Sequence, residues 1–304
     1  MRSQQWAIIL LLLALGCDKK VVLYREEIRL SPKQKSRVLV IGGSTMYGFG
    51  LKDNETIASY LRRMRPDMEI IDLSIPGGDM KDFTAGVKNI PTSHNSHSYY
   101  PFGYLDYGAD LILLCVCWND LTKDLIEECN RRQRLLGHSF YAIDRWLYER
   151  LGKNKFGFML YKGLFRWLSR NIKPCVLEAT YIGQRCSSFR QRLSNLVELL
   201  GKARIRLVIL PTLVYNRIED LAWRQFGWGR NYAEFTWEYF AKGGKLEKEI
   251  ISQVGKEMQA GVADCSNLIA KDLFMDVIHL NSKGNKEVAA YLLRDDKTGV
   301  LDGH

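Results

Sequence analysis

Two short motifs near opposite ends of the chain carry residue types that together can transfer an acyl group. Ser44 follows the apolar run 38–41 and two glycines, whereas Asp276 and His279 lie three residues apart near the other end. A serine hydroxyl is too weakly acidic to attack an ester at neutral pH, so it needs a base within hydrogen-bond reach. We expect His279 to be that base and Asp276 to hold its imidazole in the tautomer that accepts the serine proton.

Two further motifs supply hydrogen-bond donors of the kind that stabilise a negatively charged intermediate. Gly77 follows one apolar segment, and Asn119 follows another, at 111–117. The backbone N–H groups of Ser44 and Gly77 and the side-chain amide of Asn119 are the expected donors to the oxyanion. At Gly77, a larger side chain is expected to block the close approach of backbone to substrate.

Taken in order, the serine, glycine, asparagine and Asp-x-x-His motifs resemble those of the SGNH, or GDSL-type, hydrolases. The resemblance covers about 38–122 and 205–294. It implies a serine esterase that works through a covalent acyl-enzyme. The roles it implies are nucleophile for Ser44, base for His279, orienting acid for Asp276, and oxyanion donors for Ser44, Gly77 and Asn119.

The chain departs from the family pattern at two positions. The usual Gly-Asp-Ser is Gly42-Gly43-Ser44 here, and the usual glycine before the asparagine is Trp118. Neither change removes a catalytic group. The missing aspartate takes a hydrogen-bonding partner away from the nucleophile turn, and Trp118 is expected to narrow the pocket and contact the substrate.

Apolar runs separated by amphipathic stretches must position these motifs. We predict buried strands at 37–41, 69–73, 111–117 and 206–210, a short fifth strand near 273–275, and helices at 56–64, 189–202 and 282–293. Continuous apolar runs of this kind indicate a parallel sheet covered on both faces, with the carboxyl ends of its strands at one edge. The expected fold is α/β, a flavodoxin-like three-layer α/β/α sandwich with strand order 2-1-3-4-5 and the site outside the strand ends.

The first 16 residues are predicted to be a signal peptide of the lipoprotein type. Arg2 is followed by an apolar core at 7–15, which is too short to span a bilayer because a spanning helix needs about 20 residues. Cys17, after the small Gly16, is the expected lipidation site, with a polar tether at 17–36. This interpretation predicts that the protein is exported and anchored to a bacterial membrane. An ordinary cleaved signal or a short uncleaved anchor are the alternatives.

Two insertions interrupt the single domain predicted at 37–294, which is followed by a C-terminal tail at 295–304. The first, at about 123–188, is strongly basic, since 131–173 carries a net charge of +9 against +10 for the whole chain. Its helical stretch is either a solvated face packed on the core through leucines or a surface for anionic lipid. Nucleic acid is a poor partner for an exported protein, so we expect none.

The second insertion, at about 215–248, is rich in aromatic residues. Nine aromatics lie between positions 215 and 240, including Trp223, Trp228 and Trp237. These tryptophans either contact the substrate, by stacking on sugar rings or lining an acyl pocket, or pack a small core of their own.

No metal or cofactor is expected. Cys115 and Cys117 lie in an apolar run and are most simply core residues. His94 and His97 have the spacing of metal ligands, but no third acidic or cysteine ligand is near them in the sequence.

The sequence therefore predicts a membrane-tethered serine esterase that acts on acyl esters of a glycan or a lipid. Two alternatives remain open. The same triad would serve an O-acyltransferase that passes the acyl group to a glycan hydroxyl, and a noncatalytic glycan-binding lipoprotein would tolerate the loss of the aspartate before Ser44.

Overall fold

The computed structural model describes the core of the predicted domain. The described residues are 32–88, 103–116, 119–120, 134–135, 138–139, 159–160, 175–177, 182–201, 204–212, 233–235, 237–276 and 278–294. The predicted signal peptide, Cys17 and the tail at 295–304 lie outside them, as do most of both insertions.

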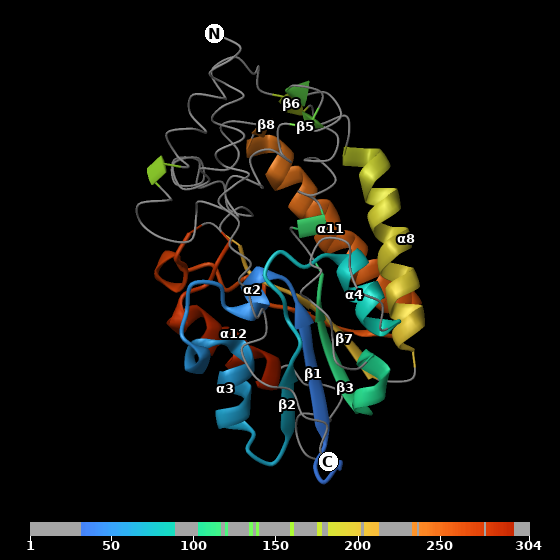
Figure 1. Ribbon diagram of the computed structural model, residues 1–304, viewed down its shortest axis with the longest axis vertical. Helices are drawn as coiled ribbons and strands as arrows, with labels where there is room; N and C mark the ends of the chain where they lie inside the picture. Colours follow the sequence, from blue (N-terminus) through green and yellow to red (C-terminus); the bar gives the residue numbers. More distant parts are fainter. Residues whose placement is uncertain are drawn as a thin grey trace, which may run out of the picture.

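A five-stranded, entirely parallel sheet forms the centre of the molecule (Figure 1). The strands are β1 (Arg37–Gly42), β2 (Glu69–Asp72), β3 (Leu111–Cys115), β7 (Arg204–Ile209) and β9 (Gly261–Asp264). Their order in the sheet is β2-β1-β3-β7-β9. This order confirms the predicted 2-1-3-4-5 arrangement of an α/β fold.

The position predicted for the fifth strand is wrong. That strand is β9, whereas the 3-10 helix η5 (Lys271–Leu273) ends at Leu273, and the next residue, Phe274, makes only an isolated β-bridge. Strand β9 contains only Val262 and Ala263 as apolar side chains, so it lacks the apolar run that marks a buried strand. It is an edge strand that pairs with β7 alone, and a short apolar stretch is sufficient there.

Helices cover both faces of the sheet (Figure 1). On one face lie α3 (Ile57–Met64) and α12 (Ser282–Arg294), and on the other lie α4 (Met80–Val87), α8 (Ile182–Leu200) and α11 (Trp237–Glu257). The short helix α2 (Ser44–Tyr47) follows β1 directly. The three predicted helices are present, whereas α4 and α11 were not predicted.

The remaining elements are short. They are η1 (Asp53–Glu55), η2 (Tyr104–Tyr107), β4 (Arg134–Leu135), β5 (His138–Ser139), β6 (Cys175–Leu177) and β8 (Ala233–Phe235). Strands β4 and β5 form an antiparallel pair, and β6 pairs in parallel with β8. Because β6 belongs to the first insertion and β8 to the second, this pairing joins the two insertions through backbone hydrogen bonds.

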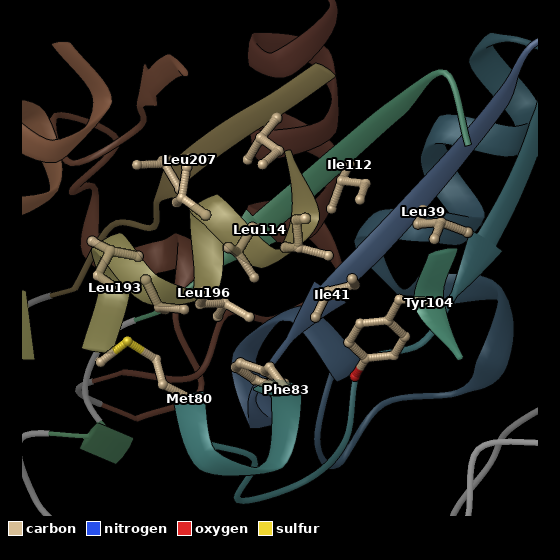
Figure 2. Packing of buried hydrophobic residues seen from close by; sticks show 14 of the residues in the cluster. Leu39, Ile41, Met80, Phe83, Tyr104, Ile112, Leu114, Leu193, Leu196 and Leu207 are labelled. Carbon is tan, nitrogen blue, oxygen red and sulfur yellow. The ribbon is translucent and has the colours of Figure 1, made fainter. Parts of the chain in front are cut away.

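The sheet separates two apolar cores because successive side chains of a strand point to opposite faces. Leu39 and Ile41 pack towards α4, α8 and α11, and Figure 2 shows Ile41 beside Phe83 and Leu196. Val38 and Val40 pack on the other side, towards α3 and α12. Burial on both faces explains why the central strands are apolar at every position.

Buried polar contacts fix the edge of the sheet where the strands begin. The Arg37 guanidinium is almost fully buried and pairs with Glu69 at 2.7 Å, while the backbone N–H of Arg37 donates to Asp110 at 2.8 Å. These bonds connect the starts of β1, β2 and β3. Among the described residues, no helix has the length and apolar character needed to cross a membrane.

Candidate active site

Ser44 lies at the carboxyl end of β1 and is the first residue of α2. A Cβ atom on Gly42 would lie 2.5 Å from Met46 Cγ and 3.2 Å from Cys115 Cβ, so glycine is needed for α2 to pack this closely on the sheet. The first N–H groups of a helix have no partner within it. As the first residue of α2, Ser44 has one of these backbone N–H groups.

His279 lies in a tight loop between η5 and α12. A β-bridge joins Phe274 to Leu280 across the loop, and the backbone N–H of Met275 donates to His279 O at 2.8 Å. Asn281 Oδ1 then accepts from the backbone N–H of Gly284 at 3.0 Å and caps the start of α12. The loop is thus held at both ends.

Hydrogen bonds connect helix α12 to η1 and α3, which follow Ser44 in the sequence. Asn285, which is fully buried, donates through Nδ2 to Glu55 O at 2.9 Å, and Tyr60 Oη shares a hydrogen bond of 2.7 Å with Ser282 Oγ. These contacts bring the start of α12 beside η1 and α3. They explain how His279 reaches Ser44 across 235 positions of sequence.

The three predicted triad residues form one continuous chain of hydrogen bonds. His279 Nε2 lies 2.9 Å from Ser44 Oγ, and His279 Nδ1 lies 2.7 Å from Asp276 Oδ2. An ionised carboxylate can only accept, so Nδ1 carries the proton towards Asp276. In the neutral imidazole, Nε2 is then free of a proton and can accept one from the serine hydroxyl.

Asp276 also shapes the loop that carries His279. Its Oδ1 atom accepts from the backbone N–H groups of Ile278 at 2.8 Å and His279 at 2.7 Å. Burial raises the pKa of Asp276, but the hydrogen bonds from the His279 side chain and from these backbone groups outweigh burial and lower the pKa overall. At neutral pH the carboxylate is therefore charged while it accepts the hydrogen bond from His279 Nδ1.

Asn119 comes from the carboxyl end of the neighbouring strand β3. Its Nδ2 atom donates to Gly78 O at 2.8 Å, so the amide is held against the segment after β2. The next residue, Asp120, is buried and accepts from the backbone N–H of Met80 at 3.2 and 3.3 Å. Sequence reasoning gave no role to Asp120, although a carboxylate directly after Asn119 was a visible signal.

Gly77 lies at the carboxyl end of β2, in a turn that the backbone N–H of Gly78 closes by donating to Ile75 O at 3.0 Å. Its φ of +71° is a conformation that glycine adopts readily. A Cβ atom on Gly77 would meet no atom of the described residues within 4 Å, so packing against them does not require glycine here, and the expected close approach of a substrate to this backbone stays a prediction. Backbone conformation requires this glycine.

Other residues singled out from the sequence are only partly placed. Trp118, Trp223, Trp228, Cys117, His94 and His97 lie outside the described residues. Trp237 is the first residue of α11, and its side chain is likewise not described. Cys115 is buried in the apolar core, as expected from its place in an apolar run. Within the described part of the chain, no three His, Cys, Asp or Glu side chains cluster as metal ligands would.

Comparison by sequence gives no match to a protein-family profile or to a curated protein. Solved structures do match. The lipase/acylhydrolase from Enterococcus faecalis has a TM-score of 0.50 at 13% identity, covering 87% of this chain and 96% of that one. LAE5, an α/β hydrolase enzyme from the metagenome of Lake Arreo, has a TM-score of 0.50 at 12% identity, covering 88% of this chain and 96% of its own.

A third similar structure is that of a mutant of Axe2, an acetyl-xylooligosaccharide esterase from Geobacillus stearothermophilus. Its TM-score is 0.50 at 11% identity, and the match covers 85% of this chain and 93% of that one. The chain has the fold of the SGNH-type hydrolases.

Proposed function

We propose that this protein is a serine esterase that hydrolyses O-acyl esters through a covalent intermediate on Ser44. The observation that carries the proposal is the unbroken chain of hydrogen bonds from Asp276 through His279 to Ser44. The acylhydrolase and the acetyl-xylooligosaccharide esterase named above share the fold and act on esters.

In the first half of the reaction, Ser44 Oγ attacks the ester carbonyl carbon while His279 Nε2 takes the hydroxyl proton. The carbonyl oxygen becomes an oxyanion, which accepts from the Ser44 and Gly77 N–H groups and from the Asn119 amide. Collapse of this intermediate breaks the bond to the alcohol oxygen, and that oxygen receives the proton from His279. Ser44 is left acylated.

In the second half, water attacks the acyl-serine and gives its proton to His279. The second tetrahedral intermediate collapses, Ser44 Oγ leaves with the proton returned by His279, and a carboxylic acid is released. Asp276 stabilises the imidazolium in both halves without taking its proton. No step needs a metal or an organic cofactor.

We place this activity on the exported side of a bacterial membrane, with Cys17 acylated and the substrate an O-acylated glycan or lipid of the cell envelope. The apolar core at 7–15 and the Gly16-Cys17 pair support the anchor. Mass spectrometry of the purified protein tests it: we expect a diacylated or triacylated Cys17 as the first residue. An unmodified Cys17, or cleavage at another position, would overturn the anchoring.

Labelling with a fluorophosphonate tests the catalytic proposal directly, because the reagent needs an activated serine and an oxyanion hole. We expect wild-type protein to be labelled at Ser44 and the Ser44→Ala and His279→Ala variants to remain unlabelled. Hydrolysis of short-chain esters should follow the same pattern. An unlabelled wild-type protein that hydrolyses no ester would favour the noncatalytic, glycan-binding alternative, and transfer of the acyl group to an added sugar would favour an acyltransferase.

A further inference from the structure

Phe49 places an exposed aromatic ring beside the catalytic base. Its side chain is 52% exposed, and its ring centroid lies 5.5 Å from that of His279, with the two planes tilted by 38°. The backbone holds this position, since the N–H of Phe49 donates to Ser44 O at 3.0 Å and the left-handed Gly48 turns the chain there. An exposed apolar side chain therefore lies next to the imidazole of His279.

Met275 adds a second exposed apolar side chain next to the first. It is 39% exposed, and its backbone N–H donates to His279 O at 2.8 Å. A Cβ atom on Gly50 would lie 3.4 Å from Met275 Cε, so the methionine lies against the loop that carries Phe49. We call these two side chains, Phe49 and Met275, the apolar rim.

The chemistry of the triad decides which part of an ester the apolar rim would touch. The carbonyl oxygen must face the donors of the oxyanion hole, Ser44 N and the Asn119 amide. The alcohol oxygen must come within hydrogen-bond reach of His279 Nε2, because that atom supplies its proton when the ester bond breaks. Groups packed around the imidazole therefore meet the alcohol part of the substrate, whereas the acyl part extends away from Ser44 on another side.

We propose that the apolar rim is the binding site for the alcohol part of the ester and selects alcohols with a flat apolar face, such as a sugar ring. This inference rests on the proposed esterase activity. It adds which part of the ester, the alcohol, contacts Phe49. Aromatic rings pack well on flat apolar surfaces, and methionine adapts to irregular ones. The attack by Ser44 and the four proton transfers remain as described above.

Two isomeric esters test the inference because they place a benzene ring on opposite sides of the ester group. Benzyl acetate carries the ring on its alcohol, and methyl phenylacetate carries it on its acyl group. Phe49→Ala should raise the KM for benzyl acetate about tenfold. It should change kcat/KM by less than about twofold for methyl phenylacetate and for ethyl acetate, which has no ring. An acetylated methyl glycoside should behave like benzyl acetate.

Matched variants separate recognition from general effects. Phe49→Leu keeps apolar bulk but loses the flat ring, so it should show a smaller rise in KM than Phe49→Ala. Leu105→Ala removes a side chain that is 39% exposed in η2, at the edge of the sheet where β3 begins, and should leave all the esters unaffected. Equal melting temperatures for these variants and the wild type would show that the fold is intact.

Three results would overturn the inference. If Phe49→Ala lowers kcat/KM equally for the two isomers, or more for methyl phenylacetate, Phe49 does not bind the alcohol part of the ester. A fall in kcat on all esters with a shifted pH profile would make Phe49 a positioning residue for His279 instead. If the wild type is neither labelled by a fluorophosphonate nor active on any ester, the proposed function itself fails, and this inference fails with it.

Discussion

The side-chain amide of Asn119 fills the space that a side chain at Gly43 would need. A Cβ atom on Gly43 would lie 2.5 Å from Asn119 Nδ2 and 3.1 Å from Gly78 O. Contacts under 3.0 Å between a Cβ atom and its neighbours are not tolerated, so one of the groups would have to move. Glycine at position 43, where the SGNH-type hydrolases that the motifs resemble usually have aspartate, therefore leaves room for the Asn119 amide, which donates to Gly78 O.

Replacing Gly43 should damage the oxyanion hole without touching the triad. We expect Gly43→Ala to displace the Asn119 amide and to lower kcat about tenfold or more, because a misplaced donor stabilises the oxyanion less. Gly43→Asp should lower it further. If the effect passes through Asn119, the double variant Gly43→Ala/Asn119→Ala should be no slower than Asn119→Ala alone. Additive losses in this cycle would contradict the coupling.

Removing the amide itself should affect the chemical step more than binding. Asn119→Ala should lower kcat about 100-fold or more with little change in KM, since the hydrogen bond strengthens only as charge develops on the carbonyl oxygen. Steady-state kinetics on a short-chain ester measure this. A large rise in KM at unchanged kcat would instead make Asn119 a residue that binds the ground state.

Ser44 and His279 should behave as one catalytic unit. Ser44→Ala and His279→Ala should each lower turnover by several orders of magnitude, and the double variant should cost little more. Their 2.9 Å contact is the physical reason, because either change removes the same activated nucleophile. Wild-type turnover in Ser44→Ala would show that the mechanism is wrong.

Sequence could predict much of the site because three motif residues follow three adjacent strands within a few positions. Ser44, Gly77 and Asn119 follow β1, β2 and β3, whose apolar runs are plain in the sequence. Parallel strands end at one edge, so the motifs had to meet there. The Asp-x-x-His spacing likewise fixed the contact between Asp276 and His279, since a short loop keeps both groups close.

The contacts that sequence could not predict depend on packing between segments far apart in the chain. Nothing local at Gly43 indicates that Asn119 lies above it, and nothing at Phe49 indicates that its ring lies beside His279. Helix α4 left a usable signal, however. Asp79 and Asp82 form a capping box at its start, and this spacing of side-chain acceptors marks a helix beginning.

Asp276 should make the stability of the protein depend on pH in one direction. Because its pKa is lowered in the folded state, the carboxylate stabilises the fold above its unfolded pKa of about 3.9, and this contribution is lost as the pH falls through the folded pKa. Asp276→Asn removes the charge at every pH. The variant should therefore be less stable than wild type near pH 7, and the difference should shrink towards pH 3. Chemical denaturation across this range measures both free energies of unfolding.

Measurements of kcat should distinguish the role of Asp276 from that of Asp272, a nearby carboxylate. Asp276→Asn should lower kcat by several orders of magnitude, because an amide can hold the imidazole in the wrong tautomer for accepting the Ser44 proton. Asp272 is the matched control: it lies four residues before Asp276 in η5, pairs with Lys283 at 2.5 Å and also has a lowered pKa, but its carboxylate pairs with Lys283 instead of His279. Asp272→Asn should keep wild-type kcat. Equal loss of activity in the two variants would mean that general disturbance of the loop, and not control of the imidazole tautomer, explains the effect of Asp276→Asn.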